Sequence, residues 1–214
     1  MILGILGSAD RDSVSRRVLE LAATRIRAAG TAYELIDLSV EFTQQHRIDD
    51  YEDPPPGSQT ARLRARIAGS SGAVMATPVY HGSYSGLLKN ALDHLTGKAL
   101  ADRPVGLIAA GGGPRGAGTA CDQMRSVVRA LGGWAVPTHI ASTGGDFTPG
   151  APLEGLHERM DDLVAELLSF RPPRRLPPSP PSPAPLAPPV LVTAAGAVRA
   201  PRPPAGEPPA LLLC

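Results

Sequence analysis

The first 170 residues alternate between short apolar runs and longer stretches in which apolar residues recur every three or four positions. The apolar runs predict strands buried on both faces, at residues 1–6, 32–38, 72–78, 103–110 and 134–142. The periodic stretches predict helices at residues 13–30, 58–68, 83–95, 117–132 and 153–170. Residues 39–57 show neither pattern and predict a loop. Such alternation is typical of a parallel sheet covered by helices on both faces.

A change in composition near Phe170 separates this alternating region from a proline-rich remainder. Residues 171–189 read RPPRRLPPSPPSPAPLAPP. Proline lacks the N–H group that helices and sheets need, so we expect a disordered or polyproline-like tail. Its P-x-x-P spacing is also found in ligands of SH3-like domains, but a solvated spacer is the simpler interpretation. The sequence thus predicts one domain at residues 1–170 and a tail at residues 171–214.

A domain of this size with strict alternation is expected to be flavodoxin-like or Rossmann-like. The flavodoxin-like form is a three-layer sandwich whose five parallel strands run in the order 2-1-3-4-5. In such sheets ligands bind beyond the carboxyl ends of the strands, where the loops after the first, third and fourth strands lie. These loops read GSADRDSVS, TPVYHGSYSG and GGGPRGAG. Glycine and small polar residues allow the backbone to approach a ligand closely, so we expect the binding site there.

Charge and composition exclude several other classes of function. The net charge of the chain is +1, and five of its arginines lie in the tail, which leaves the body mildly acidic and argues against nucleic-acid binding. No apolar run approaches the roughly 20 residues of a membrane span. The five histidines and two cysteines show no metal-binding spacing, so we expect no metal. The chain opens on a strand-like run without a basic segment, so we expect no signal peptide and a cytoplasmic protein.

The first of the three loops has the residues of a phosphate site. Ser8, Ser13 and Ser15 supply hydroxyls, and Arg11 and Arg16 supply positive charge. The predicted helix that follows begins with unpaired N–H groups, which favour anions. The equally simple alternative is an ordinary helix cap by Ser13 with solvated arginines.

The second loop carries the most specific pattern in the chain. The run TPVYHGSYSGLLKNALDHL, at residues 77–95, resembles the NADPH-dependent FMN reductase family, and most of all its alkanesulfonate-linked branch. The resemblance covers about residues 1–145. It implies that the backbone of this loop packs against the flavin ring through Pro78, Val79, Tyr80, His81 and Gly82. The alternative from the residues alone is a strand end that turns into a capped helix, with Tyr80 buried against it.

The same resemblance assigns roles to the other two loops. The family pattern for the FMN phosphate is G-S-x-R-x-x-S-x-N/S, which Gly7, Ser8, Ser13 and Ser15 match. Asp10 occupies the arginine position and Arg11 follows it, which predicts a weaker grip on the phosphate because a carboxylate repels an anion. The resemblance implies that the third loop closes over the edge of the flavin ring through Gly111, Gly112 and Gly113. A glycine-rich turn without a ligand is the alternative.

The resemblance implies an NAD(P)H-dependent FMN reductase. NADPH or NADH would pass a hydride to FMN, and the reduced flavin would serve a flavin-dependent monooxygenase or reduce a quinone or azo acceptor. No acid–base catalytic residue is expected, because the cofactor carries the reaction. The family implies a homodimer or homotetramer, with Tyr84 and Leu88 as contacts. Two alternatives from other classes are a flavodoxin-like electron carrier and a flavin-free interaction scaffold.

Overall fold

The computed structural model describes residues 1–148 and 151–173 of the chain. These residues belong to one compact unit, Met1–Arg174. The predicted tail lies outside the described residues from residue 174 onward, and the predicted boundary between domain and tail stays a prediction.

Five parallel strands form the main part of a six-stranded sheet, and they follow the predicted order. The strands are β1 Ile2–Leu6, β2 Tyr33–Asp37, β3 Gly72–Tyr80, β5 Pro104–Ala110 and β6 Trp134–Ser142. Their order, β2-β1-β3-β5-β6, is that of the flavodoxin-like form. Every residue of β1 and β5 is buried, as their unbroken apolar runs predict for inner strands. The edge strands β2 and β6 are partly exposed, and the exposed Pro137 is tolerated within β6 because an edge strand needs fewer backbone donors.

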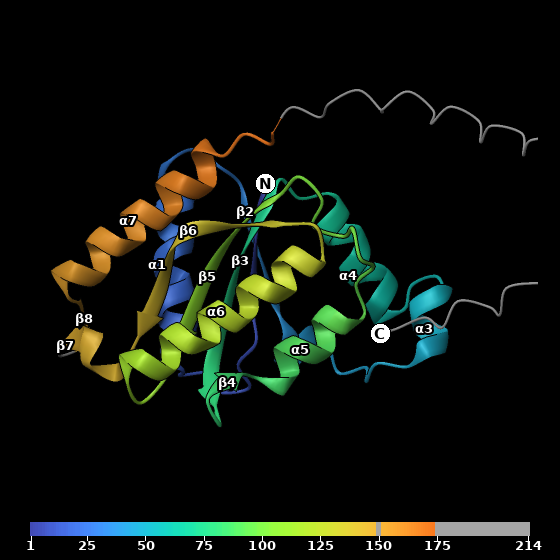
Figure 1. Ribbon diagram of the computed structural model, residues 1–214, viewed down its shortest axis with the longest axis horizontal. Helices are drawn as coiled ribbons and strands as arrows, with labels where there is room; N and C mark the ends of the chain where they lie inside the picture. The colour runs from blue at the N-terminus through green and yellow to red at the C-terminus, as the bar shows by residue number, and fades with distance from the viewer. Residues whose placement is uncertain (149–150, 174–214) are drawn as a thin grey trace, which may run out of the picture. The chain divides into compact units, whose positions relative to one another are not determined.

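Helices cover both faces of the sheet (Figure 1). They are α1 Val14–Ala28, α2 Leu38–Glu41, α3 Ile48–Glu52, α4 Gln59–Ala68, α5 Gly86–Asp93, α6 Pro114–Ala130 and α7 Glu154–Ser169. One core cluster joins α1 and α7 to one face of the sheet, and a second joins α4, α5 and α6 to the other. The result is the predicted three-layer sandwich. No helix among the described residues is long and apolar enough to cross a membrane.

The structure differs from the predicted elements in four places. The helix predicted at residues 117–132 is α6, which already begins at Pro114, so only the first residues of the predicted third loop lie outside a helix. The segment predicted as a loop at residues 39–57 contains most of α2 and all of α3, which are too short to show a helical period. The helix predicted to begin at residue 83 begins at Gly86, because Ser83–Tyr84 form a short strand, β4, antiparallel to β3. A 3₁₀ turn, Gly144–Asp146, and a small hairpin of β7 Phe147–Thr148 and β8 Ala151–Pro152 precede α7.

Candidate functional site

The first and second loops meet at the carboxyl end of the sheet, the lower edge in Figure 1. Ser85, which caps α5, donates its hydroxyl hydrogen to the carbonyl oxygen of Gly7 over 2.6 Å. The N–H of Gly7 in turn donates to the carbonyl oxygen of Ala76 over 2.8 Å. A Cβ atom on Gly7 would lie only 2.7 Å from the Cβ of Leu88. The two loops therefore pack too closely for a side chain at position 7.

The second and third loops also lie against each other. A Cβ atom on Gly111 would lie 3.0 Å from two carbon atoms of the Val79 side chain. The N–H of Gly111 donates to the carbonyl oxygen of Ser142 over 3.0 Å, which ties the third loop to the end of β6. The three loops singled out by the sequence are thus brought together at one edge.

The hydroxyl groups of the first loop hold the loop itself in shape. The buried Ser8 hydroxyl accepts the N–H of Asp10 over 3.2 Å. Ser13 caps α1 by accepting the N–H of Arg16, and the buried Ser15 donates to the Ser13 hydroxyl over 3.3 Å. Part of the alternative interpretation therefore holds, because Ser13 is an ordinary helix cap.

The charges of the first loop lie on its exposed side. The carboxylate of Asp10 accepts the N–H of Asp12 over 2.9 Å, so it folds back along the loop. Arg11 is exposed. The guanidinium of Arg17 lies 3.9 Å from the centre of the Phe147 ring. The contact with Asp12 keeps Asp10 in a local turn, next in the chain to the exposed Arg11.

Arg16, counted among the charges of the first loop, has a partner that the sequence analysis missed. It donates to the carboxylate of Asp37, at the end of β2, and this pair anchors the start of α1. Burial alone would raise the pKa of Asp37, but hydrogen bonds from Arg16 and Ser39 outweigh it and lower the pKa. Asp37 therefore stays ionised at neutral pH, and Arg16 is held toward β2. Neither residue has a periodic or motif signal that would have revealed the pair.

The second loop ends in a tight hairpin turn. His81 and Gly82 have φ angles of 51° and 79°, the signs that a two-residue hairpin between β3 and β4 requires. Pro78 and Val79 are half-buried, and Tyr80 is 50% exposed. The alternative that buries Tyr80 against the following helix is therefore wrong, because the hairpin turns its ring outward.

A glutamine on α6 holds this turn. The Ser83 hydroxyl donates to Oε1 of Gln123 over 2.5 Å, and Nε2 of Gln123 donates to the carbonyl oxygen of Gly82 over 3.4 Å. Sequence analysis missed Gln123, because nothing in the pattern of α6 distinguishes it from other exposed helix residues.

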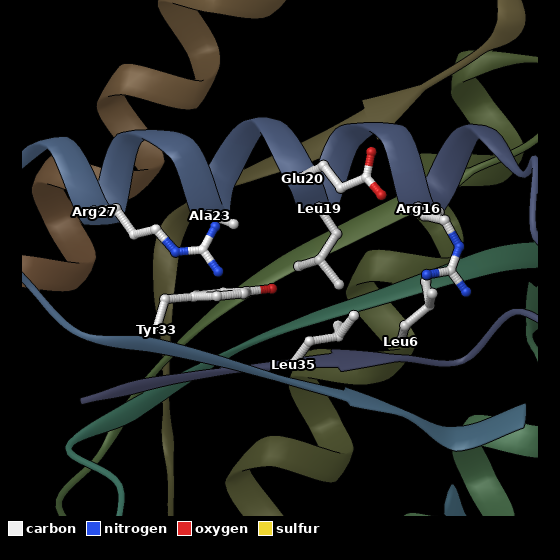
Figure 2. Close-up of a pocket in the computed structure, with 8 residues that line it drawn as sticks. All are labelled: Leu6, Arg16, Leu19, Glu20, Ala23, Arg27, Tyr33 and Leu35. Carbon is white, nitrogen blue, oxygen red and sulfur yellow. The ribbon is translucent and has the colours of Figure 1, made fainter. Parts of the chain in front are cut away.

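The hollow shown in Figure 2 lies between α1 and the edge strand β2, and none of the residues that line it belongs to the three loops. It has a volume of about 90 Å³ and a mixed lining of Leu6, Arg16, Leu19, Glu20, Ala23, Arg27, Tyr33 and Leu35. Burial raises the pKa of Tyr33, and a Cβ atom on Gly4 would lie 1.7 Å from its hydroxyl oxygen. A hollow of this volume can hold a few water molecules but not a cofactor.

A larger cleft of about 630 Å³ begins beside the first loop. It lies between α2, the segment that follows α2, and α5, and is lined by Ala9, Leu38, Ser39, Phe42, Thr43, Gln45, His46, Leu87 and Asn90. The Asn90 amide fixes this segment, since it donates to the carbonyl oxygen of Gln44 and accepts the N–H of His46. The edge that carries the three loops thus has open space beside it.

The chain is similar to known proteins over most of the domain. The model of the NADPH-dependent FMN reductase family matches residues 1–147. An FMN-dependent NADPH-azoreductase of Staphylococcus aureus is 33% identical over 148 residues, which are 67% of this chain and 77% of that protein.

Solved structures with lower identity share the fold. The NAD(P)H:(acceptor) oxidoreductase FerB of Paracoccus denitrificans has a TM-score of 0.65 at 20% identity, over 78% of this chain and 96% of that one. A flavodoxin of Streptococcus pneumoniae has a TM-score of 0.54 at 13% identity, over 78% and 98% of the two chains. The fold is therefore flavodoxin-like, and the chain belongs to the NADPH-dependent FMN reductase family.

Proposed function

We propose that the protein is an NAD(P)H-dependent FMN reductase that uses NADPH or NADH as the electron donor. The observation that carries the proposal is the meeting of three loops of small residues at the carboxyl end of the sheet. Gly7 and Gly111 lie where a Cβ atom would crowd the neighbouring loop, and nothing lies within 4 Å of a Cβ atom placed on Gly112 or Gly113. A crowded base with an open rim fits a flat ring that the backbone must approach closely.

We assign the FMN phosphate to the first loop and the start of α1. Ser8, Ser13 and Ser15 keep that loop in shape, and the exposed Arg11 supplies the charge. Asp10 folds back on Asp12, which lets Arg11 approach the phosphate while the nearby carboxylate weakens the binding.

We assign the flavin ring to the backbone of residues 78–82 and 111–113. FMN held by these residues would supply the redox chemistry, as the acceptor of hydride from NADPH or NADH. The backbone of the two loops would position the rings, so the expected contribution of the protein is orientation rather than proton transfer. The exposed Tyr80 and His81 stand at the rim, where a second ring would enter.

The acceptor of the electrons belongs to the same proposal. The azoreductase relative supports an azo acceptor, and a quinone acceptor stays a prediction of the sequence analysis. Release of reduced FMN to a flavin-dependent monooxygenase is the second route, which weak binding of the phosphate would favour.

We further propose a cytoplasmic homodimer or homotetramer. Leu88 is fully buried in its own core and cannot serve as a contact, whereas Tyr84 is half-buried at the surface.

Steady-state kinetics tests the function directly. We expect oxidation of NADPH or NADH that depends on added FMN and needs no partner protein. An electron carrier would bind FMN without oxidising either nucleotide alone. A flavin-free scaffold would leave the fluorescence of added FMN unchanged.

Gly112→Val tests the place of the flavin. Because space around Gly112 is open, the fold should tolerate valine, while the side chain should obstruct the ring and raise the KM for FMN by about tenfold or more, some 1.4 kcal/mol. Gly97→Val is the matched control, since Gly97 also has open space and lies between α5 and β5, away from the three loops. Equal kinetics in the two variants would place the flavin elsewhere.

A further inference from the structure

A hollow of about 380 Å³ lies at the far end of the third loop. Its lining comes from the first turn of α6, the end of β6, the 3₁₀ turn and α7, namely Pro114, His139, Ala141, Thr143, Asp146 and Arg159. Pro114 is three residues from Gly111, so the wall of the hollow is at most about 11 Å along the chain from the proposed flavin ring. A molecule that covers the ring can therefore extend into the hollow.

Arg159 gives the hollow its positive charge. Its Nη2 lies 3.5 Å from Oδ1 of Asp146, and its side chain is 44% exposed. A guanidinium has five N–H donors in a planar fork, so this single long contact leaves donors directed to solvent. The group can bind a second oxyanion without moving from α7.

The carboxylate of Asp146 is already satisfied by the protein. Its Oδ2 accepts the hydroxyl of Ser142 and the N–H of Thr143, both over 2.9 Å, while Oδ1 accepts from Arg159. Asp146 thus caps the 3₁₀ turn, and its charge is shared among three donors. A second guanidinium, that of Arg125, lies behind His139 and adds positive charge to this side of β6.

His139 supplies a neutral donor. Nη2 of Arg125 lies 3.2 Å from Nδ1 of His139, and because a guanidinium only donates, Nδ1 must accept and the ring proton lies on Nε2. Burial and then the Arg125 charge lower the pKa of His139, which favours the neutral ring. Thr143 accepts the N–H of Gly145 over 3.2 Å, which leaves its hydroxyl hydrogen to donate. Donors from three elements therefore line one small space.

We propose that this hollow, through Arg159, binds an oxyanion carried by a molecule whose ring lies on the flavin. The inference rests on the proposed reductase function and adds a specificity site to it. The chemistry fits a phosphate or a sulfonate, which have the same tetrahedral array of acceptor oxygens. Two sources meet the requirement: the 2′-phosphate that distinguishes NADPH from NADH, and the sulfonate of an azo dye acceptor.

Arg159→Ala separates the two sources. If the hollow holds the 2′-phosphate, the KM for NADPH should rise about tenfold while the KM values for NADH and FMN stay unchanged. If it holds a sulfonate, the same rise should appear for a sulfonated azo dye and not for its unsulfonated analogue. Arg129→Ala, at the opposite end of α6, is the control and should change neither. Equal changes for charged and uncharged partners, or no change for any of them, would overturn the proposal.

Direct binding measurements on the wild-type protein test the anion site without turnover and without relying on a variant that must fold. Calorimetry with 2′,5′-ADP against 5′-ADP, and with the sulfonated dye against its analogue, should show tighter binding of the probe with the extra anion. Arg159→Lys should keep part of that preference, which covers the case in which the alanine variant does not fold. A wild-type protein that oxidises neither nucleotide would refute the reductase function, whereas one that binds both members of each pair equally would refute the anion site.

Discussion

Gly7 is required by its surroundings rather than by its backbone angles. It is buried at the junction of the first two loops, and a Cβ atom there would lie 2.7 Å from the Cβ of Leu88 and 3.1 Å from the Ser85 hydroxyl oxygen. Leu88 is fixed in the core and Ser85 caps α5, so neither neighbour can move without disturbing a helix. Gly86, one residue beyond Ser85, has nothing within 4 Å of its Cβ position.

We therefore expect opposite effects from the same substitution at these two glycines. Gly7→Ala should lower the free energy of unfolding by about 2 kcal/mol, the usual cost of overpacking a core, and should weaken FMN binding because the first loop must shift. Gly86→Ala should leave stability unchanged or raise it by up to about 1 kcal/mol, since alanine favours a helix more than glycine. Urea denaturation and FMN titration measure both quantities. A stable Gly7→Ala variant with normal FMN binding would show that the loops are looser than this packing indicates.

The β3–β4 hairpin takes its position from α6 as well as from the sheet. Its two-residue turn places His81 and Gly82 at the exposed rim, where the family resemblance assigns the flavin. The two strands pair only at Val79 with Tyr84 and at Tyr80 with Ser83, which is too little to hold a hairpin firmly. The side-chain amide of Gln123 adds two hydrogen bonds to this turn from outside the sheet.

Removal of that amide should affect the site more than the fold. We expect Gln123→Ala to raise the KM for FMN three- to tenfold, about 0.7 to 1.4 kcal/mol, because the turn loses its external support. The free energy of unfolding should change by less than about 1 kcal/mol, since both hydrogen bonds are exposed to solvent. Ser126→Ala, an exposed change one turn further along α6, is the control for kinetics and for urea denaturation. A loss of stability without a change in KM would assign Gln123 to the fold instead.

On both edge strands of the sheet, β2 and β6, side chains form hydrogen bonds with backbone groups. On β6, Glu166 accepts the N–H of Thr138 over 2.7 Å, and Arg125 donates to the carbonyl oxygens of Val136 and Pro137. On β2, Arg66 donates to the carbonyl oxygen of Leu35 over 2.7 Å. Occupied edge groups oppose the addition of a further strand. Association of two chains is therefore expected through helices and loops rather than through a continuous sheet.

The two core clusters and the three loops all lie within the first 173 residues. We expect a chain that ends at residue 173 to keep its kcat and its KM for FMN within about twofold, because nothing in the proposed site comes from beyond that point. A chain that ends at residue 169 is the informative comparison. It loses Phe170, whose ring centre lies 6.1 Å from that of Trp134, and should melt a few degrees lower. A large loss of activity in the longer of the two chains would show that the tail contributes to the site or to assembly.

Local patterns predicted the layers of the molecule because burial on one or both faces leaves a periodic trace within each element. The unbroken apolar runs of β1 and β5 and the helical period of α1 and α6 are of this kind. The carboxyl ends of parallel strands share one edge, so the three loops that should meet there could also be named in advance. Short elements such as α3 and β4 could not, because a few residues do not show a period.

Contacts between distant residues were decided only by the tertiary structure. The pairing of Gln123 with the hairpin, of Arg16 with Asp37 and of Arg159 with Asp146 joins positions whose spacing in the chain carries no regularity. The sequence shows the residue types only. A small loop residue or an exposed arginine has the same sequence pattern whether or not it has a partner in the fold. Which of them meet depends on how the helices lie over the sheet, and that arrangement follows from the packing of the whole core rather than from any local pattern.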